Sequence, residues 1–512
     1  MQNNFIPSAS RIAAAIGWLG LGTVAQAELT RGPYLQDSTP TSIVLRWRTS
    51  TAETSQVVFG TDLAAPDRIS TDDFPVTEHL VTLTNLQPDT RYFYFIGATN
   101  TPLAGPDANH FFLTHPLPGT PKPIRVWVIG DAGTHSASQI AVRDAFETFN
   151  GTNTLHVWLQ LGDNAYDVGS DAEYQSAVFA VYTNELRNSV TWPTLGNHDT
   201  AQLSDYVDTY PYFDIFTLPT AGEAGGVPSG TEHYYSFDLG MVHFICLDSM
   251  TASRATNGAM ALWLQSDLAV TTNRWLVAYW HHPPYSKGSH DSDGEGELIQ
   301  MRQNFLPRLE AGGVDLVLSG HSHAYERSQF LNGHYGFSTS FNSTNVVQAG
   351  SGRETNGVGA YHKPDGLGEN PLGHRGTIYT VAGTSGQIGG GALNHPAMYF
   401  SKSALGSLVL DFNANRLDAI FLRETGVIDD SFTLIKDGTY PPLLTNAVAL
   451  PEGAFQFTVQ TRAGRTNVIE AATNLTAGWL PVFTNAPADA SFTFTDTNAP
   501  SDALRLYRVR RQ

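Results

Sequence analysis

The feature that most constrains this chain is a set of apolar runs, several of which end in a short polar motif. The runs have the length and continuous apolar character of buried strands, and two stretches between them, residues 138–149 and 298–311, have the spacing of amphipathic helices. Strands that alternate with helices predict an α/β domain, which we place at residues 119–438. The strand-like runs are Ile124–Ile129, His156–Leu161, Trp275–Trp280 and Val314–Leu318.

Five polar motifs lie in this region, and four of them open with glycine. Glycine allows the backbone to turn sharply at a strand end and to approach a ligand closely. In α/β sheets, ligands bind at the carboxyl ends of the strands, so we expect the motifs to meet there. The motifs are Gly130-Asp131-Ala132-Gly133, Gly162-Asp163-Asn164-Ala165-Tyr166-Asp167, Gly196-Asn197-His198-Asp199, His281-His282-Pro283 and Gly320-His321-Ser322-His323.

These motifs offer oxygen and imidazole donors, which together are typical of a metal site. Seven such side chains gathered at strand ends would be unfavourable without a cation, because uncompensated buried charge is costly. Carboxylate, phenolate and imidazole ligands suit iron, zinc or manganese. A shared carboxylate allows two metals to lie about 3.5–4 Å apart. We expect Asp163 to be this bridge, because it lies centrally among the motifs.

Each of these residues has a simpler interpretation when it is taken alone. Asp131 could cap the helix that follows it, Asn197 could serve a turn, and Tyr166 could be a packing aromatic. His281 and His282 are adjacent, so the choice between them is ambiguous from the residues alone. The weight of the metal hypothesis therefore comes from the series of motifs and not from any single member.

Composition limits the partners and the redox chemistry of the chain. The 29 Lys and Arg residues against 48 Asp and Glu give a formal charge of −19, so duplex nucleic acid is not an expected partner. The single cysteine, Cys246, excludes an internal disulfide and is expected to be buried. The glycine-rich stretch 383–391 lacks the lysine of a phosphate-binding loop, so we interpret it as a loop near the site. The pair Asp429-Asp430 is expected on the solvated surface.

Three segments flank the α/β region. Residues 1–27 have the pattern of a secretory signal peptide, which predicts a secreted or periplasmic protein, and no other segment is long and apolar enough to span a membrane. Residues 28–118 contain short alternating strands with Pro and Asp turns, which predict a small β-sandwich. Residues 439–512 alternate in the same way and predict a small all-β module. The oligomeric state is left open.

The motifs resemble those of the metallophosphoesterase superfamily, and more narrowly those of the purple acid phosphatases. The wider superfamily carries Asp-x-His in its first motif, where this chain has Gly133 in place of the histidine. Tyr166 in the second motif is the mark of the purple group, and residues 320–327 are close to the family's form. The resemblance implies a four-layer metallophosphoesterase-type β-sandwich flanked by helices, preceded by a fibronectin type III-like domain. It does not extend to residues 439–512.

The resemblance also implies two metal positions. The first would hold Fe(III), and the second would hold Fe(II), Zn or Mn. The residues implied for the first position are Asp131, Asp163, Tyr166 and His323. The residues implied for the second position are Asp163, Asn197, His281 and His321. In this assignment the Tyr166 phenolate would give the protein a violet colour.

The implied reaction is hydrolysis of a small phosphate monoester by a metal-bound hydroxide. We expect His198 and His290 to bind the substrate and to supply a proton to the leaving alcohol. His290 precedes an acidic run that ends at Glu297 and resembles the family's His-x-x-x-Glu-Gly-Glu segment. Two alternatives stay open. One is a phosphodiesterase or nucleotide hydrolase on the same metal core, and the other is a surface-binding protein whose catalytic domain has decayed.

Overall fold

The structure is a computed structural model of the 512-residue chain. It describes residues 27–511, apart from the positions that follow. These are residues 99–100, 202–209, 355–356, 358, 364–374, 437–441, 462–463, 465, 475–477, 490 and 500–503. The predicted signal peptide therefore lies almost wholly outside the described residues.

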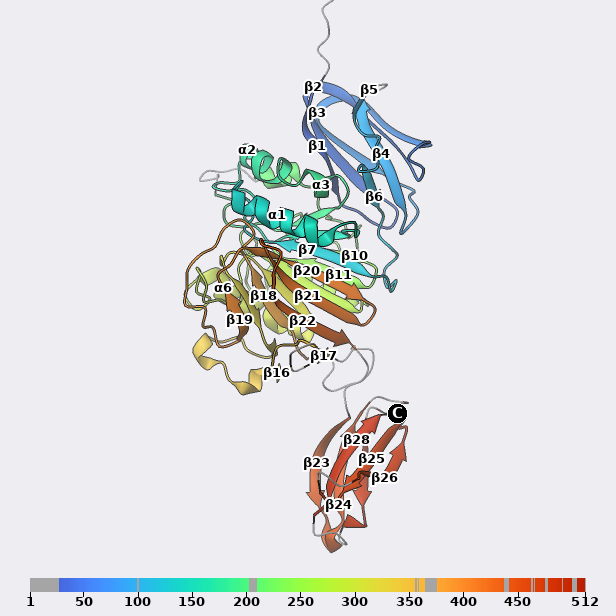
Figure 1. The fold of residues 1–512 in the computed structure, drawn as a ribbon, viewed down its shortest axis with the longest axis vertical. Helices are drawn as coiled ribbons and strands as arrows, with labels where there is room; N and C mark the ends of the chain where they lie inside the picture. The colour runs from blue at the N-terminus through green and yellow to red at the C-terminus, as the bar shows by residue number, and fades with distance from the viewer. Residues whose placement is uncertain are drawn as a thin grey trace, which may run out of the picture.

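The N-terminal region is an all-β domain (Figure 1). Its strands are linked in the order β1-β2-β4-β5, with β3 paired to β2 and β6 paired to β4. The strands are β1 (Leu29–Gln36), β2 (Ile43–Gly60), β3 (Arg68–Leu83), β4 (Arg91–Ala98), β5 (Thr101–Ala104) and β6 (Phe111–Leu113). The alternating runs at residues 42–48 and 55–59 are not separate short strands, because β2 runs through both. In the polar stretch between them the register with β3 shifts twice, and Glu53 lies opposite Val76.

The central domain contains two seven-stranded sheets (Figure 1). One has the order β10 (Tyr235–Leu239), β11 (Val242–Cys246), β12 (Trp275–Trp280), β13 (Leu316–Ser319), β18 (Ile378–Ala382), β14 (Tyr325–Ser328) and β19 (Met398–Lys402). The other has the order β17 (Tyr361–Lys363), β22 (Ile428–Lys436), β21 (Arg416–Arg423), β20 (Gly406–Asn413), β7 (Ile124–Ile129), β8 (Val157–Gln160) and β9 (Thr191–Pro193). The sheets pack on each other through large apolar side chains, for example Phe412 of β20 against Trp275 of β12, with ring centroids 5.5 Å apart.

Helices cover the outer faces of the two sheets. Helix α1 (Ala137–Asn150) packs on the second sheet, where Phe146 stacks on Trp127 with centroids 4.2 Å apart. Helices α5 (Ala259–Val270), α6 (Gly296–Asn304) and α7 (Leu306–Ala311) pack on the first sheet and bury an apolar cluster against it. The layers are thus helix, sheet, sheet and helix, which is the metallophosphoesterase-type arrangement expected for this domain. The shorter elements are α2 (Asp171–Tyr174), η1 (Gln175–Phe179), α3 (Thr183–Leu186), α4 (Pro211–Ile215), β15 (Phe330–Leu331), η2 (Ser338–Ser340), η3 (Ser343–Asn345) and β16 (Val346–Gln348).

Two expectations from the sequence differ from the structure in this domain. The single helix expected over residues 298–311 is divided into α6 and α7 at Phe305. Pro307 lies in the first turn of α7, where its missing N–H leaves no backbone bond unmade. Asp430 is buried and not solvated, because the guanidinium of Arg327 pairs with both of its carboxylate oxygens inside the core.

The N-terminal domain is tied to the central domain by polar contacts, some of them buried. Arg31 and Arg48 both pair with Asp171, the first residue of α2. Tyr34 donates to the carbonyl of Ile215 at 2.9 Å, and apolar residues of both domains belong to one continuous core cluster. The N-terminal domain therefore supports the segment that follows β8.

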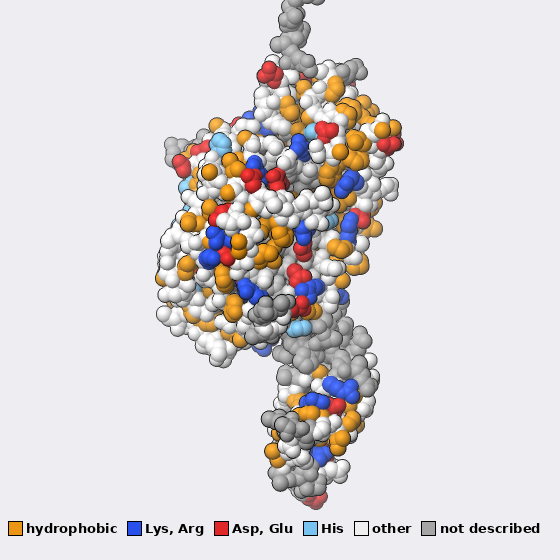
Figure 2. Space-filling view, in the orientation of Figure 1, with side chains coloured by type: hydrophobic (Ala, Val, Ile, Leu, Met, Phe, Trp, Pro, Cys, Tyr) orange, Lys and Arg blue, Asp and Glu red, His pale blue; other side chains and the backbone are white. Residues whose placement is uncertain are grey.

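The C-terminal residues form two three-stranded sheets with a small core of their own, and Figure 1 shows them beyond the central domain, at the end away from the N-terminal domain. Their strands are β23 (Leu443–Ala449), β24 (Phe455–Gln460), β25 (Asn467–Ala472), β26 (Leu480–Asn485), β27 (Ser491–Asp496) and β28 (Leu506–Arg511), with the short helix η4 (Pro451–Gly453). On the face drawn in Figure 2, acidic and basic side chains of the described residues are interspersed. Cys246 is buried, as expected. None of the helices in the described part of the chain has the length and apolarity needed to cross a bilayer.

Candidate metal centre

The five motifs meet at one end of the two sheets. Strands β7, β8 and β9 are parallel neighbours, and so are β12 and β13, so their carboxyl ends point the same way within each sheet. The residues of the motifs contact one another across the junction of the two sheets, for example where the backbone N–H of His321 donates to Asp131 at 2.8 Å. The structure thus brings together all seven residues for which the sequence predicted a metal-binding role.

The backbone at these strand ends adopts unusual conformations. Asp131, Asp163 and His321 have φ values of 54°, 52° and 66°, in the left-handed region that residues other than glycine rarely adopt. The glycine before His321 is needed for packing, because a Cβ on Gly320 would lie 2.5 Å from a carboxylate oxygen of Asp131. Such strain persists only where the surrounding structure enforces it, and it is concentrated at functional sites.

A first cluster of donor atoms surrounds the hydroxyl of Tyr166. That oxygen lies 2.9 Å from Oδ2 of Asp163, 3.4 Å from Oδ1 of Asp131 and 3.3 Å from Nε2 of His323. Nε2 of His323 lies 3.4 Å from Oδ1 of Asp131. Donor atoms of Asp131, Asp163 and His323 all lie within 4.8 Å of one another, which is the spacing that a shared cation requires.

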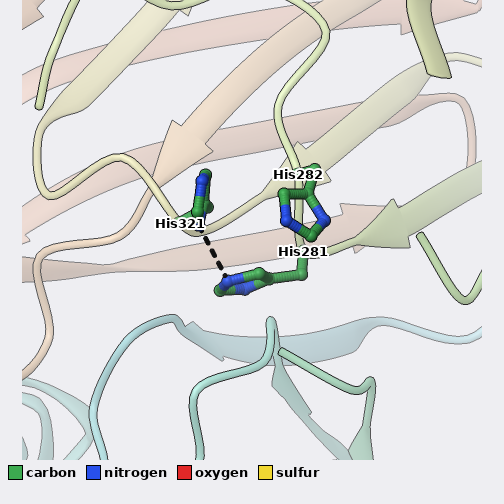
Figure 3. A group of neighbouring side chains, drawn as sticks. All are labelled: His281, His282 and His321. Atoms are coloured by element: carbon green, nitrogen blue, oxygen red, sulfur yellow. Dashed lines mark hydrogen bonds between the residues drawn. The ribbon is translucent and has the colours of Figure 1, made fainter. Parts of the chain in front are cut away.

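A second cluster is formed by Asn197, His281 and His321. Oδ1 of Asn197 lies 3.0 Å from Nε2 of His281 and 3.0 Å from Nδ1 of His321. Figure 3 shows the rings of His281 and His321 directed toward one another, and the two nitrogens are 3.2 Å apart. Nε2 of His281 also lies 3.5 Å from Oδ1 of Asp163. The two carboxylate oxygens of Asp163 therefore face different clusters, as expected of a bridging ligand.

Hydrogen bonds at the outer side of each imidazole orient the ring nitrogens. His281 donates from Nδ1 to the carbonyl of Leu161 at 2.8 Å, so Nε2 is left with its lone pair toward Asn197. His321 donates from Nε2 to Glu295 at 3.0 Å, so Nδ1 is left toward Asn197. Partners of this kind fix the tautomer of a metal-binding histidine and raise its basicity.

The ambiguity between His281 and His282 is reduced by the geometry. Both are buried, but Nδ1 of His282 is hydrogen-bonded to the hydroxyl of Ser249 at 2.9 Å. The ring of His282 lies 4.5 Å from that of His321, and ligand atoms of all three histidines in Figure 3 lie within 4.8 Å of one another, but no contact joins His282 to Asn197 among the hydrogen bonds of the described residues. The structure therefore places His281, and not His282, against Asn197.

The electrostatics of the first cluster are those of a site that lacks positive charge. Burial and the carboxylates of Asp131 and Asp163 raise the pKa of the Tyr166 hydroxyl far above its ordinary value. Burial by itself lowers the pKa of His323, but the hydrogen bond to Asp131 more than offsets this and raises it. Among the described residues, no Lys or Arg pairs with either aspartate. Bound cations would supply the missing charge and allow Tyr166 to ionise, so the donor set fits the expected metal pair.

The two predicted substrate-binding histidines lie at the rim of these clusters. Nδ1 of His198 is 2.6 Å from the carbonyl of Asp167, and its ring lies 4.3 Å from that of Tyr166. Nδ1 of His290 is 2.9 Å from Glu295, and its ring lies 3.7 Å from that of His321. Both side chains are half-buried, and in each the hydrogen bond at Nδ1 leaves Nε2 as the atom that can reach a ligand.

Two residues that support the motifs, Glu295 and Asp199, were not predicted as site residues from the sequence. Glu295 contacts both His290 and His321, and these hydrogen bonds lower its pKa to about 2. Asp199 is buried and accepts hydrogen bonds from the backbone of Gly196 and Asn164. Asp199 could have been found from the sequence, because it is the last residue of the third motif. Glu295 was harder to find, because only the resemblance of its acidic run to a family segment pointed to it.

Comparisons with known proteins agree with this geometry. Residues 124–325 match the family of calcineurin-like phosphoesterases, and residues 33–111 match the purple acid phosphatase N-terminal domain. Purple acid phosphatase 23 of Arabidopsis thaliana is 31% identical over 281 residues, which cover 49% of this chain and 57% of the relative. Purple acid phosphatase 1 of Ipomoea batatas is 28% identical over 266 residues, which cover 49% and 52%. The chain thus spans about half the length of the curated relatives that it matches.

Solved structures show the same fold. The purple acid phosphatase PPD1 from yellow lupin (Lupinus luteus) seeds has a TM-score of 0.59 at 19% identity, over 80% of this chain and 75% of that one. PhoD has a TM-score of 0.57 at 14% identity, over 81% and 91%. The fold and the site define a calcineurin-like metallophosphoesterase. Within that class, the chain is similar in both its N-terminal and its central domain to purple acid phosphatases, so the resemblance seen in the sequence is confirmed.

Proposed function

We propose that this protein is a secreted phosphatase that hydrolyses small phosphate monoesters at a pair of metal ions. The observation that carries the proposal is the position of Asp163, whose two carboxylate oxygens face two separate clusters of donor atoms. The first position is assigned to Fe(III) with Asp131, Tyr166 and His323. The second is assigned to Fe(II), Zn or Mn with Asn197, His281 and His321. Export through the segment at residues 1–27 is part of the same proposal.

The chain's own residues have defined tasks in this reaction. When bound, the metal pair polarises the phosphoryl group and lowers the pKa of water at the site. His198 and His290 bind the phosphoryl oxygens through Nε2, since Nδ1 of each is engaged by Asp167 or Glu295. One of them returns a proton to the leaving alcohol from that nitrogen. Glu295 keeps His290 against His321 and so holds it near the second position.

The proposal is tested by metal analysis and by a paired assay. The purified protein should contain two metal ions per chain and absorb visible light when iron is present. It should also hydrolyse an aryl phosphate monoester faster than the matching diester. A preference for the diester would instead favour a phosphodiesterase on the same centre. Fewer than two bound ions after supply of iron and zinc, together with no hydrolysis, would favour a non-catalytic binding protein.

A further inference from the structure

Glu173 holds the loop that connects Tyr166 to α2. Its carboxylate accepts hydrogen bonds from the backbone N–H groups of Asp167 at 2.6 Å, Val168 at 3.2 Å and Ser170 at 2.8 Å. The hydroxyl of Ser170 donates to the same carboxylate at 2.8 Å. One side chain thus fixes three N–H groups of this loop, and the proposed function gives it no task.

The peptide group between Asp167 and Val168 links Glu173 to a predicted substrate-binding residue. The N–H of this group belongs to Val168 and donates to Glu173. Its carbonyl belongs to Asp167 and accepts a hydrogen bond from Nδ1 of His198 at 2.6 Å. Because the group is planar, Glu173 fixes the direction in which the carbonyl points. Hydrogen bonds in such a chain also polarise and strengthen one another. Nδ1 of His198 is therefore held as a donor, and Nε2 is the nitrogen left for a ligand.

The loop and α2 pack closely on the third motif, which carries His198. Gly169 has a φ of 69°, and a Cβ at this position would lie 2.5 Å from the carbonyl oxygen of Asp199. The hydroxyl of Tyr174, the residue after Glu173, donates to the carboxylate of Asp199 at 2.6 Å. These contacts keep Glu173 at a fixed position relative to His198.

Glu173 also completes the cap of a helix, which by itself would be a structural role. The backbone N–H of Glu173 donates to the hydroxyl of Ser170, the N-cap residue of α2, at 3.3 Å. A capping box of this kind needs only the reciprocal contacts between Ser170 and Glu173. The hydrogen bonds from Asp167 and Val168 lie outside the box, so the cap does not account for them.

We propose that Glu173 is a positioning residue, whose carboxylate orients the peptide group between Asp167 and Val168 and through it holds Nε2 of His198 toward the phosphoryl group. This inference rests on the proposed function, because it needs a substrate that His198 binds. It goes further, because Glu173 lies outside the five motifs and acts on the site through a backbone group.

The test compares Glu173→Ala with Ser170→Ala in full-length protein loaded with iron and zinc. Ser170→Ala removes the hydroxyl of the helix cap and leaves the bonds from Asp167 and Val168 to Glu173, so it is the matched control. Glu173→Gln keeps the size of the side chain and one acceptor oxygen. Each variant is also made with His198→Ala. Equilibrium dialysis measures the binding of inorganic phosphate, elemental analysis measures metal content, and circular dichroism reports the fold.

We expect inorganic phosphate to bind about tenfold more weakly to Glu173→Ala, which is the scale of one hydrogen bond to a charged group. Glu173→Gln should lose less affinity, because one acceptor remains. Ser170→Ala should bind phosphate like the unaltered protein, and all three variants should keep their metal ions. In the His198→Ala background, the same changes at Glu173 should have no further effect. If the circular dichroism of Glu173→Ala changes, Glu173→Gln alone carries the comparison.

An equal loss of phosphate affinity with and without the His198 imidazole would overturn the inference alone, and so would an equal loss in Ser170→Ala. Either result would show that Glu173 acts only on the stability of the loop. Unaltered phosphate binding in His198→Ala would remove the task assigned to His198, and the inference with it. Unaltered protein that binds no metal would overturn the proposed function as a whole.

Discussion

The carboxylate of Glu295 lies 3.0 Å from Nε2 of His321, on the side of the ring that faces away from Asn197. This contact fixes Nδ1 as the nitrogen directed into the second donor cluster. The other oxygen of Glu295 holds His290 at 2.9 Å, so one side chain orients both a predicted metal ligand and a predicted substrate-binding residue. The second position is therefore organised from outside its ligands as well as by them.

Replacing Glu295 should weaken the second metal position without changing the fold. In Glu295→Ala, His321 loses the acceptor that sets its tautomer, and we expect metal affinity to fall about ten- to a hundredfold. Metal content after dialysis against a chelator measures this. Glu297→Gln is the matched control. Glu297 lies in the same segment as Glu295, but its carboxylate pairs with Arg254 and not with a histidine of the site. Equal metal retention in the two variants would show that Glu295 has no such role.

Tyr166→Phe should remove the violet colour of the iron-loaded protein and leave the fold unchanged. The phenolic oxygen contacts Asp163, Asp131 and His323. Its removal therefore takes one donor from the first position and leaves the apolar core as it is. The visible spectrum and far-ultraviolet circular dichroism of the same sample check both parts. A variant that keeps its absorption would show that Tyr166 does not bind the iron.

Asn197→Ala should have the reciprocal effect, with loss of the second metal and retention of the first. Oδ1 of Asn197 is the atom that His281 and His321 share, at 3.0 Å from each. Elemental analysis should therefore give about one ion per chain, with the visible band of the iron retained. If both ions remain bound, or if both are lost together, the division of the donors into two positions is wrong.

The convergence of the motif residues could be predicted from the sequence because each of them follows a strand. Asp131, Asp163, Asn197, His281 and His321 each stand one to four residues beyond a strand, and parallel strands bring such positions together. A local pattern was enough because the sheet supplies the long-range geometry. The resemblance then sorted the same residues into two metal positions.

Pairings between distant segments could not be predicted in the same way. Asp430 has the local pattern of a surface residue, but Arg327, which is 103 positions away, meets it inside the core. Glu295 acquires its contacts only from the path of the loop between His290 and α6. The polar residues after Arg48 also interrupt the alternating pattern within β2, where the register with β3 shifts on both sides of Glu53. Each case depends on a partner that no local window contains.

His243 should make stability depend on pH in the alkaline range. Its ring is fully buried, with Nδ1 2.7 Å from Asp238 and Nε2 2.8 Å from Asp267. Burial by itself lowers the pKa of His243, but the two carboxylates raise it to about 9, above the ordinary value of 6.5. A pKa raised on folding stabilises the protein fully below about 6.5, and this is lost as the pH rises through 9. A shift of this size corresponds to about 3 kcal/mol.

Thermal unfolding measured between about pH 7 and pH 10 tests this loss, because the pKa of His243 in the folded protein lies within that range. The melting temperature should fall across that range in the unaltered protein. Asp238→Asn removes one of the two carboxylates, so the pKa of His243 drops and the fall should begin at lower pH. Identical pH profiles for the two proteins would mean that His243 is not charged in the folded state.

Asp171 should couple the N-terminal domain to the loop that carries Tyr166. Its carboxylate pairs with Arg48 at 2.6 Å and with Arg31 at 2.9 Å, and it begins the helix α2 that follows that loop. The hydrogen bond from Arg48, helped by Arg31, lowers the pKa of Asp171 to about 2. The contribution to docking is therefore present above the ordinary value of 3.8 and is lost as the pH falls toward 2.

Asp171→Asn should loosen this contact at neutral pH, because Arg31 is buried and would lose its charged partner. Limited proteolysis should then cut between the two domains faster, and the first metal should dissociate more readily as the Tyr166 loop gains freedom. Asp144→Asn is the matched control, because Asp144 forms an ion pair with Arg143 on the exposed side of α1 and touches neither domain contact. Faster proteolysis in both variants would point to a general loss of stability. Faster proteolysis in Asp171→Asn with unchanged metal retention would show that the docking contact does not reach the site.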